Sequence, residues 1–333
     1  METLKILYLT TSETDYLQDS ILIGLRQLLG NNLIDFPKKH VLYKTNNKKN
    51  IYGKGFTLYN YLEDILVDRE NIKNKIINNE FDFIFFSSIH RQISLLKELY
   101  PILRKKKVVF LDGEDHPSLF AFNGKYWRNP KYWFLPKVHK KFIYFKREYT
   151  PETIKYRYYK LIPDFLIQYI NLRNIIPISF AFPSTKIIKE IPKKEKLFQE
   201  HIVDEEIARI LKKQVQYVFD LEIDYYKDLR KSRYGITTKR SGWDAIRHYE
   251  IAANGTIPCF KNLHLKPDTC APHGLNETNC IIYSDYKDLM VQIGNINDDK
   301  YIELQKNVIE WVNSKSTISI AKQIIEIINA KSK

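Results

Sequence analysis

Short apolar runs alternate with amphipathic stretches along the first part of the chain. Residues 4–9 are apolar and end at polar residues, and apolar residues then recur at helical spacing over 16–29, just before Gly30. The same order returns as an apolar run at 81–86 and a helical pattern at 93–103. Apolar runs separated by amphipathic helices predict a parallel sheet that is covered on both faces. Further strands are predicted at 108–111, 142–145 and 178–182.

The alternation resumes after a polar, proline-flanked stretch at residues 183–196. Helices are predicted at 204–213, 225–231, 243–253, 286–293, 300–312 and 318–328, and strands at 234–237, 257–260 and 280–283. A length of 333 residues suits two domains. We therefore predict an α/β protein of two Rossmann-like domains, residues 1–185 and 186–333, that face a cleft, with helices at the C-terminus.

The charge balance favours an anionic partner. The chain has 53 Lys and Arg against 39 Asp and Glu, a net charge of +14. Such a charge attracts nucleic acid, acidic lipid headgroups or phosphorylated small molecules. The basic residues are scattered in short runs rather than gathered in one arm, so nucleic-acid binding is the less favoured interpretation.

The sequence carries no membrane-targeting pattern. No run of about 18 apolar residues is present, and the N-terminal segment is too short and polar for a signal peptide. The three cysteines, Cys259, Cys270 and Cys280, lack metal-binding spacing even with His264 and His273 nearby. We expect free thiols and a cytoplasmic protein whose membrane contact is at most peripheral, at the inner face.

The segment at 238–258 concentrates candidate binding residues. Lys239, Arg240, Ser241 and Gly242 lie between a predicted strand and a predicted helix, where free N–H groups and the helix dipole attract anions. Two cations at this turn suit a phosphate. The alternative is an ordinary solvated turn.

The predicted helix that follows adds a cation and a carboxylate. Arg247 and Glu250 are three residues apart and would share a face with Trp243. Glu250 could accept hydrogen bonds from ribose hydroxyls, and Gly255 would end the helix. Alternatively, Arg247 and Glu250 form a surface ion pair, and Trp243 packs in the core.

This segment resembles the C-terminal donor-site signature of glycosyltransferases of the GT-B fold, including uncharacterised bacterial "family 1"-type members. The similarity rests on Arg247-His-Tyr-Glu250, Ala253-Asn-Gly255 and Ile257-Pro258. The resemblance implies that Glu250 binds the ribose of a nucleotide sugar and that Lys239, Arg240 and Arg247 contact its diphosphate, with Ser241 and Gly255 completing the donor site. Many retaining members carry a second carboxylate eight residues earlier, where this chain has Gly242.

A second candidate site follows the strand predicted at 108–111. Asp112, Glu114, Asp115 and His116 stand at its carboxyl end, and crowded carboxylates can raise one another's pKa toward the range of a general base. Asp-Gly and His-Pro are also turn dipeptides, so a simple turn is the alternative. The sequence does not choose among the four catalytic candidates.

Two further polar groups follow predicted strands. The run at 146–148 could contribute a cation to the cleft or form an ion pair. Glu13, Asp15 and Asp19 could line the acceptor side, although capping of the following helix is favoured.

Together these features predict a hexosyl-type transferase of polysaccharide biosynthesis. It would move a sugar from a nucleotide-sugar donor to a saccharide or lipid-linked saccharide acceptor, with no metal and no other cofactor, because cations and a helix N-terminus offset the charge of the leaving diphosphate. The residues that would bind the donor lie in domain 186–333, and the acceptor would bind domain 1–185. The alternatives are a basic nucleic-acid-binding protein and an inactive nucleotide-sugar-binding module.

Overall fold

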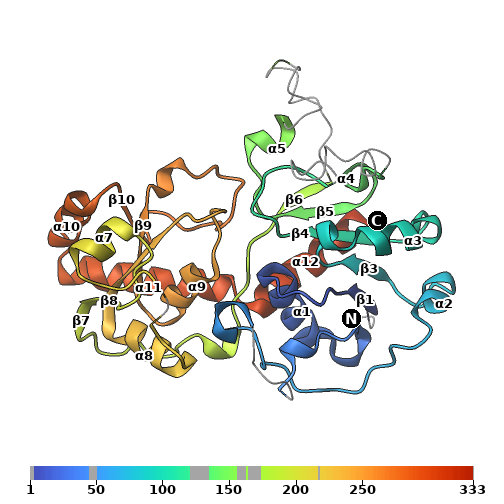
Figure 1. The fold of residues 1–333 in the computed structure, drawn as a ribbon, viewed down its shortest axis with the longest axis horizontal. Helices are drawn as coiled ribbons and strands as arrows, with labels where there is room; N and C mark the ends of the chain where they lie inside the picture. Colours follow the sequence, from blue (N-terminus) through green and yellow to red (C-terminus); the bar gives the residue numbers. More distant parts are fainter. Residues whose placement is uncertain are drawn as a thin grey trace.

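The computed structural model describes residues 4–44, 51–120, 135–155, 163, 174–216 and 218–332. It contains a six-stranded and a four-stranded sheet, each with its own helices, side by side (Figure 1). We call the larger sheet with its helices the N-terminal half and the smaller one the C-terminal half. Within the described residues, no helix combines the length and the apolar run needed to cross a membrane.

All strands of the N-terminal half are parallel, in the order β2-β1-β3-β4-β5-β6. Their bounds are β1 Ile6–Leu9, β2 Leu33–Phe36, β3 Phe83–Phe86, β4 Val108–Asp112, β5 Ile143–Lys146 and β6 Ile175–Pro177. The helices are α1 Tyr16–Leu29, α2 Ile72–Ile77, α3 Ile93–Leu103, α4 Val138–Lys141 and α5 Pro151–Lys155. Parallel strands require such crossovers, which bury both faces of the sheet.

The two faces of this sheet belong to two hydrophobic clusters, because successive side chains of a strand point in opposite directions. Leu7 and Leu9 of β1 pack in the cluster that contains Leu96 and Leu99 of α3. Ile6 and Tyr8 belong to a cluster that continues through α1 into the C-terminal half, where it includes Trp243, Tyr249 and Trp311. The two halves therefore share one core across their contact.

The C-terminal half has the strand order β10-β9-β8-β7, again all parallel. Its strands are β7 Lys196–Phe198, β8 Ser232–Thr238, β9 Ile257–Lys261 and β10 Ile281–Tyr283. Its helices are α7 Glu205–Ile210, α8 Glu222–Lys231, α9 Ile246–Ala253, α10 Tyr286–Gly294 and α11 Asp298–Ser314. Short 3-10 turns lie at Gly30–Asn32, His40–Leu42, Tyr52–Gly55, Ile89–Arg91, Ser184–Lys186 and Leu263–Leu265.

The last helix, α12 (Thr317–Lys331), returns to the N-terminal half and packs against α1 (Figure 1). The contact is closest at Gly24, where a Cβ atom would lie 2.0 Å from the carbonyl oxygen of Thr317. Glycine allows this approach because it has no side chain. The C-terminus of the chain thus lies over the N-terminal half.

The structure confirms the predicted α/β class with two parallel sheets, but three details differ. The strand predicted at 178–182 is wrong, because Phe180 and Phe182 use their backbone N–H groups on Asp244 and Lys315 rather than on a sheet. The helix predicted at 243–253 begins only at Ile246. The sequence did not predict strands β2, β6 and β7 or helices α2, α4 and α5. The boundary between residues 185 and 186 stays a prediction.

Candidate functional site

The loops that follow the carboxyl ends of strands in the two sheets meet each other. In the N-terminal half these loops follow β4 and β5, and in the C-terminal half they follow β8 and β9. Glu148 accepts from the Trp243 N–H at 2.9 Å, and Arg147 donates to the Asp244 carbonyl oxygen at 2.9 Å. We call this contact region the junction. Ligands of open parallel sheets gather at such carboxyl ends.

Arg147 is the central cation of the junction and is fully buried. Its guanidinium forms ion pairs with Asp115 and Glu148 and donates to the Gly113 carbonyl oxygen. It also stacks over the Phe180 ring, 4.6 Å from the centroid. Buried charges must be paired, so Arg147 holds the loops of both halves in one arrangement. The run at 146–148 therefore forms ion pairs, one of its two predicted roles.

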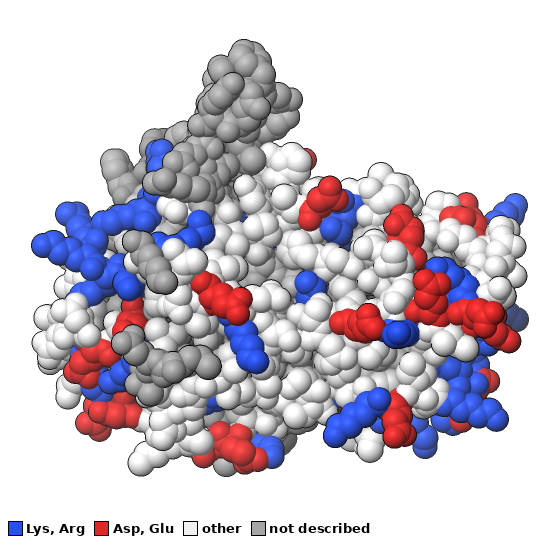
Figure 2. Space-filling model, turned by 180° about the vertical axis from the view of Figure 1, so that it is seen from behind, with Lys and Arg blue, Asp and Glu red and all other residues white. Residues whose placement is uncertain are grey.

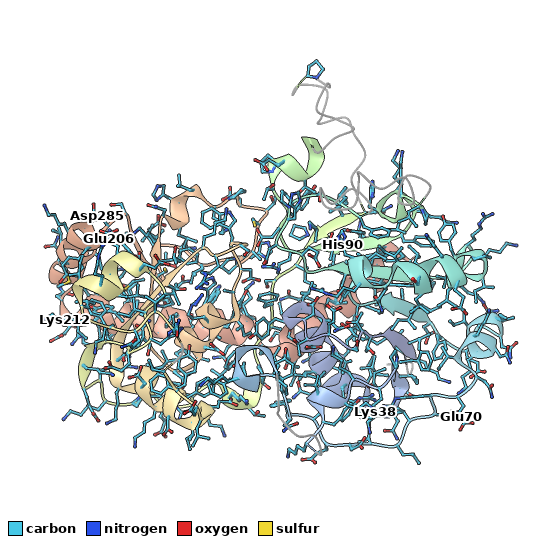
Figure 3. All side chains as sticks on the ribbon, viewed as in Figure 1. Lys38, Glu70, His90, Glu206, Lys212 and Asp285 are labelled. Atoms are coloured by element: carbon cyan, nitrogen blue, oxygen red, sulfur yellow. The ribbon has the colours of Figure 1, made fainter. Side chains whose placement is uncertain are left out.

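Asp112, the last residue of β4, is completely buried. It contacts Lys146 at 3.0 Å and His90, which is labelled in the N-terminal half in Figure 3, at 3.1 Å, and it accepts from the Tyr144 hydroxyl. Burial alone would raise the pKa of Asp112, but Lys146 and His90 hold it well below its usual value. A buried, ionised and fully paired carboxylate is suited to organising the loop.

The other three candidates of this loop are more accessible. The side chain of Glu114 is 28% exposed and lies 3.3 Å from Arg91, which also pairs with Glu13 and Asp15. The Asp115 side chain is 53% exposed while it pairs with Arg147. Burial, together with Lys146, lowers the pKa of His116, whose Nδ1 lies 2.8 Å from the Ser118 hydroxyl. Asp115 is the carboxylate that combines exposure with a place at the junction.

Asp15 also has the role that the sequence favoured. Its side chain accepts from the N–H groups of Leu17 and Gln18 and so caps α1. Asp19 lies buried on α1, where burial raises its pKa to about 6.

The predicted phosphate turn lies between β8 and α9. Lys239, Arg240 and Ser241 are exposed, and the Lys239 ammonium lies 4.8 Å from the centre of the Trp243 ring. Among the described residues, no carboxylate lies within ion-pair distance of Lys239 or Arg240. These two cations are therefore exposed to solvent and accessible to an anionic ligand.

The two charged residues of α9 differ in accessibility. Arg247 is half-buried, and its Nε lies 3.4 Å from the Thr237 hydroxyl. Glu250 is only 1% exposed, and it accepts from the hydroxyls of Tyr225, at 3.1 Å, and Thr57. Burial raises its pKa above the ordinary value. Arg247 and Glu250 are therefore not an exposed surface pair.

Comparison with solved structures places this arrangement among known folds. HepE of Anabaena, in a complex with UDP and glucose, superposes with a TM-score of 0.56 over 98% of this chain and 100% of that chain, at 10% identity. A glycosyltransferase of Rickettsia africae matches over 100% of both chains with a TM-score of 0.56 and 10% identity. The chain has the GT-B fold. No protein family model and no curated protein sequence matches it.

The GT-B fold agrees with the resemblance drawn from residues 247–258. A second HepE structure, with UDP-glucose, matches over 98% of this chain at a TM-score of 0.56 and 10% identity. At such low identity the likeness defines the fold alone.

Within this GT-B fold, Gly242 and Trp243 stand outside α9. Ala245 has extended backbone angles, so the helix begins after it. A Cβ atom on Gly242 would lie 2.5 Å from the nearest carboxylate oxygen of Glu148. Trp243 is 9% exposed and packs in the shared core, which was the alternative role. At Gly255, φ is +64°, consistent with its predicted place after the helix.

Sequence reasoning missed Thr57 and Tyr225 as partners of Glu250. Thr57 lies in an irregular segment, and its contact with Glu250 spans 193 residues of sequence. The sequence pattern marks Tyr225 only as the start of a predicted helix. No local pattern marks either hydroxyl. Tyr225 on α8 reaches Glu250 within the C-terminal half, 25 residues away in sequence, and Thr57 reaches it only across the contact between the halves.

The described residues contain no group of three or more His, Cys, Asp or Glu side chains arranged to hold a metal ion. The three cysteines are buried and free of disulfides. Burial raises the pKa of Cys280 above its ordinary value.

Proposed function

We propose that this protein is a glycosyltransferase that moves a sugar from a nucleotide-sugar donor to a hydroxyl of an acceptor. One observation carries the proposal. The carboxyl ends of two parallel sheets meet at the junction. An accessible carboxylate of one half, Asp115, therefore lies beside the turn of the other half that carries Lys239 and Arg240, where a Cβ atom on Gly242 would be 2.8 Å from the Asp115 Oδ1. Donor and acceptor sites on facing domains are what transfer between two substrates requires.

The donor side would comprise Lys239, Arg240, Ser241, Arg247, Glu250 and Gly255. The cations would bind the diphosphate and stabilise the negative charge that develops as it leaves, which is the basis for proposing transfer without a metal. Glu250 would bind the ribose, and Gly255 would end the helix that carries it. Because HepE structures contain UDP or UDP-glucose, a uridine nucleotide carrying a hexose is the first donor to test.

Asp115 is the proposed base on the acceptor side. The acceptor oxygen would form a bond to the anomeric carbon as the bond from that carbon to the diphosphate breaks, and the carboxylate would take the hydroxyl proton. Glu114 and His116 lie on the same loop and remain alternatives. Asp112 would position the loop through Lys146 and His90.

The proposed acceptor is a saccharide, free or lipid-linked, and lipid linkage would bring the protein to an anionic membrane. Residues 104–107 precede β4, and Lys140 and Lys141 come just before β5. Because β4 and β5 are parallel neighbours, these cations share one edge of the sheet. Figure 2 shows basic side chains gathered on the N-terminal half, on the left. We propose that this basic edge of the N-terminal sheet makes peripheral contact with the cytoplasmic face of the membrane. The expected result is that the protein sediments with anionic vesicles and does not sediment with zwitterionic ones.

Nucleotide binding tests the function directly. UDP, GDP, ADP, dTDP and CMP are each added to the full chain, and its melting temperature is measured. Selective stabilisation by one nucleotide is expected, because a ligand that binds only the folded state raises its stability. Retention of an oligonucleotide with steep salt dependence, without nucleotide selectivity, would instead indicate a nucleic-acid-binding protein.

Substitution of Asp115 tests the catalytic part. We expect Asp115→Asn to lower the rate of sugar transfer by about 100-fold or more while nucleotide affinity stays within about twofold, since a general base contributes 10²–10⁴-fold. Glu114→Gln is the matched comparison on the same loop. Full activity of Asp115→Asn would show that another residue is the base. If neither the unmodified protein nor any variant transfers a sugar from any donor tested, the result would favour a binding module.

A further inference from the structure

Two side chains of the N-terminal half form hydrogen bonds with polar groups of the C-terminal half, and these are groups that the proposed donor would need for its own hydrogen bonds. The Thr57 hydroxyl donates to Glu250 on α9, and the Glu148 carboxylate accepts from backbone N–H groups in the turn before α9. Thr57 and Glu148 are far apart in sequence, yet both contact α9 or the turn that leads into it.

Thr57 presents to Glu250 the group that a ribose would present. It is an aliphatic hydroxyl, completely buried, and it lies 2.8 Å from the Tyr226 hydroxyl. A ribose hydroxyl has the same donor and acceptor capacity. The carboxylate of Glu250 is thus already bonded to a hydroxyl from the opposite half.

The backbone at Thr57 is strained. Its φ is +68°, a left-handed conformation that β-branched residues rarely adopt. Lys54 and Asn60 in the same segment also have positive φ, at +55° and +53°. Such a backbone persists only where surrounding contacts hold it, so the bonds to Glu250 and Tyr226 stabilise this segment in place.

Glu148 presents to the turn the group that a phosphate would present. One of its oxygens accepts from the Trp243 N–H at 2.9 Å and from the Asp244 N–H at 3.4 Å. The side chain is buried, and the neighbouring Arg147 balances its charge at 3.1 Å. Phosphate oxygens are anionic acceptors of the same kind. Gly242 permits this approach, because a Cβ there would collide with the carboxylate.

We propose that Thr57 and Glu148 are internal substitutes for the ribose hydroxyl and the phosphate of the donor. Donor binding then requires both to leave α9 and its preceding turn, so the affinity for the donor is lowered by the stability of these contacts. The physical basis is a conformational equilibrium. When only a fraction of the protein is in the binding-competent state, the apparent affinity for a ligand equals the intrinsic affinity multiplied by that fraction. This inference rests on the proposed function.

The test measures UDP affinity by calorimetry in the full-length protein and its variants. Thr57→Ala removes the hydroxyl, and Thr57→Ser keeps it as the matched control. Glu148→Gln removes the charge but keeps an acceptor oxygen, so its bonds to the turn become neutral and weaker. Glu277→Gln, at an exposed position, is its control. We expect Thr57→Ala to tighten UDP binding by about two- to tenfold, the range for one lost competing hydrogen bond. We expect Glu148→Gln to tighten it by a similar factor, about two- to tenfold, because a charge-assisted bond becomes a neutral one of about half the strength. Both controls should match the unmodified protein.

The outcomes separate the inference from the proposed function. Unchanged or weaker UDP binding in both variants, with normal binding in the unmodified protein, overturns the inference alone. Tighter binding in one variant only overturns the role of the other residue. No UDP binding by any variant, together with no response to the other nucleotides, defeats the proposed function. Because Thr57→Ala and Glu148→Gln act at separate contacts, poor folding of one leaves the other as the test.

Discussion

His248 lies buried on α9 with both ring nitrogens bonded. Nε2 lies 3.0 Å from the Trp243 carbonyl oxygen, and because this oxygen can only accept, Nε2 carries the proton and donates it. Nδ1 is then unprotonated and accepts from the Thr237 hydroxyl at 3.0 Å. Burial, together with the nearby Arg247, lowers the pKa of His248 to about 3. The imidazole is therefore neutral in the folded protein and becomes protonated far more easily in the unfolded chain.

This difference makes stability depend on pH. The unfolded chain binds a proton at His248 below its ordinary pKa of 6.5, so the stabilisation present above that pH is lost progressively toward pH 3. We expect His248→Gln to reduce the loss of unfolding free energy between pH 7 and 4.5 by ~2–3 kcal/mol. Urea unfolding across this range measures it. His40→Gln, at an exposed position, is the control, and an equal pH slope in His248→Gln would contradict the argument.

At the residue scale, the sequence indicated which polar and charged side chains are candidates for a functional site, but it did not indicate the contact partners of each one. Asp15 was predicted as a helix cap because capping is a local interaction, and the structure confirms it. Asp112 and Asp115 looked equivalent, because both follow the same strand. Their different burial depends on Lys146, His90 and Arg147, which come from other elements.

The contact between α1 and α12 is the clearest feature at the scale of elements. We expect Gly24→Ala to lower the free energy of unfolding by ~1–3 kcal/mol, because the added methyl group would collide with the Thr317 backbone and force the helices apart. Gly294→Ala on α10 is the matched control, since no atom lies within 4 Å of its Cβ position. It should be neutral or slightly stabilising, because alanine favours helix. Chemical denaturation of both variants provides the comparison, and an equal effect would exclude the close packing.

The accuracy of the predicted elements follows from how much information each segment carries. Helix α1 was predicted over its observed bounds, because fourteen residues of helical spacing end at a glycine. Strands β2 and β7 are as short as the predicted strands β1 and β10, but each contains a charged residue, Asp35 or Lys196, so neither forms an apolar run. Residues 178–182 are buried and mostly apolar, like a strand. This composition does not reveal that the Phe180 and Phe182 N–H groups bond to Asp244 and Lys315, which are not part of a neighbouring strand.

Arg147 connects the halves at the scale of the whole molecule. We expect Arg147→Met to lower the free energy of unfolding by ~3–5 kcal/mol, because it leaves the buried Glu148 without its charge partner. Calorimetry should also show a broader thermal transition, as the two halves lose part of their coupling. Arg209→Met, at an exposed position on α7, is the control. A transition identical to that of the unmodified protein would show that the apolar core alone joins the halves.

The sequence by itself determined the class of the fold and the local endings of its longer elements. Hydrophobic spacing, caps and breakers act over a few residues, and the turn at 239–241 could be placed after a strand on that basis alone. The tertiary structure decided how the junction is composed. Contacts such as Glu148 with Trp243 and Thr57 with Glu250 join residues 95 and 193 positions apart. No periodic pattern encodes such distances, because they result from the packing of one half against the other.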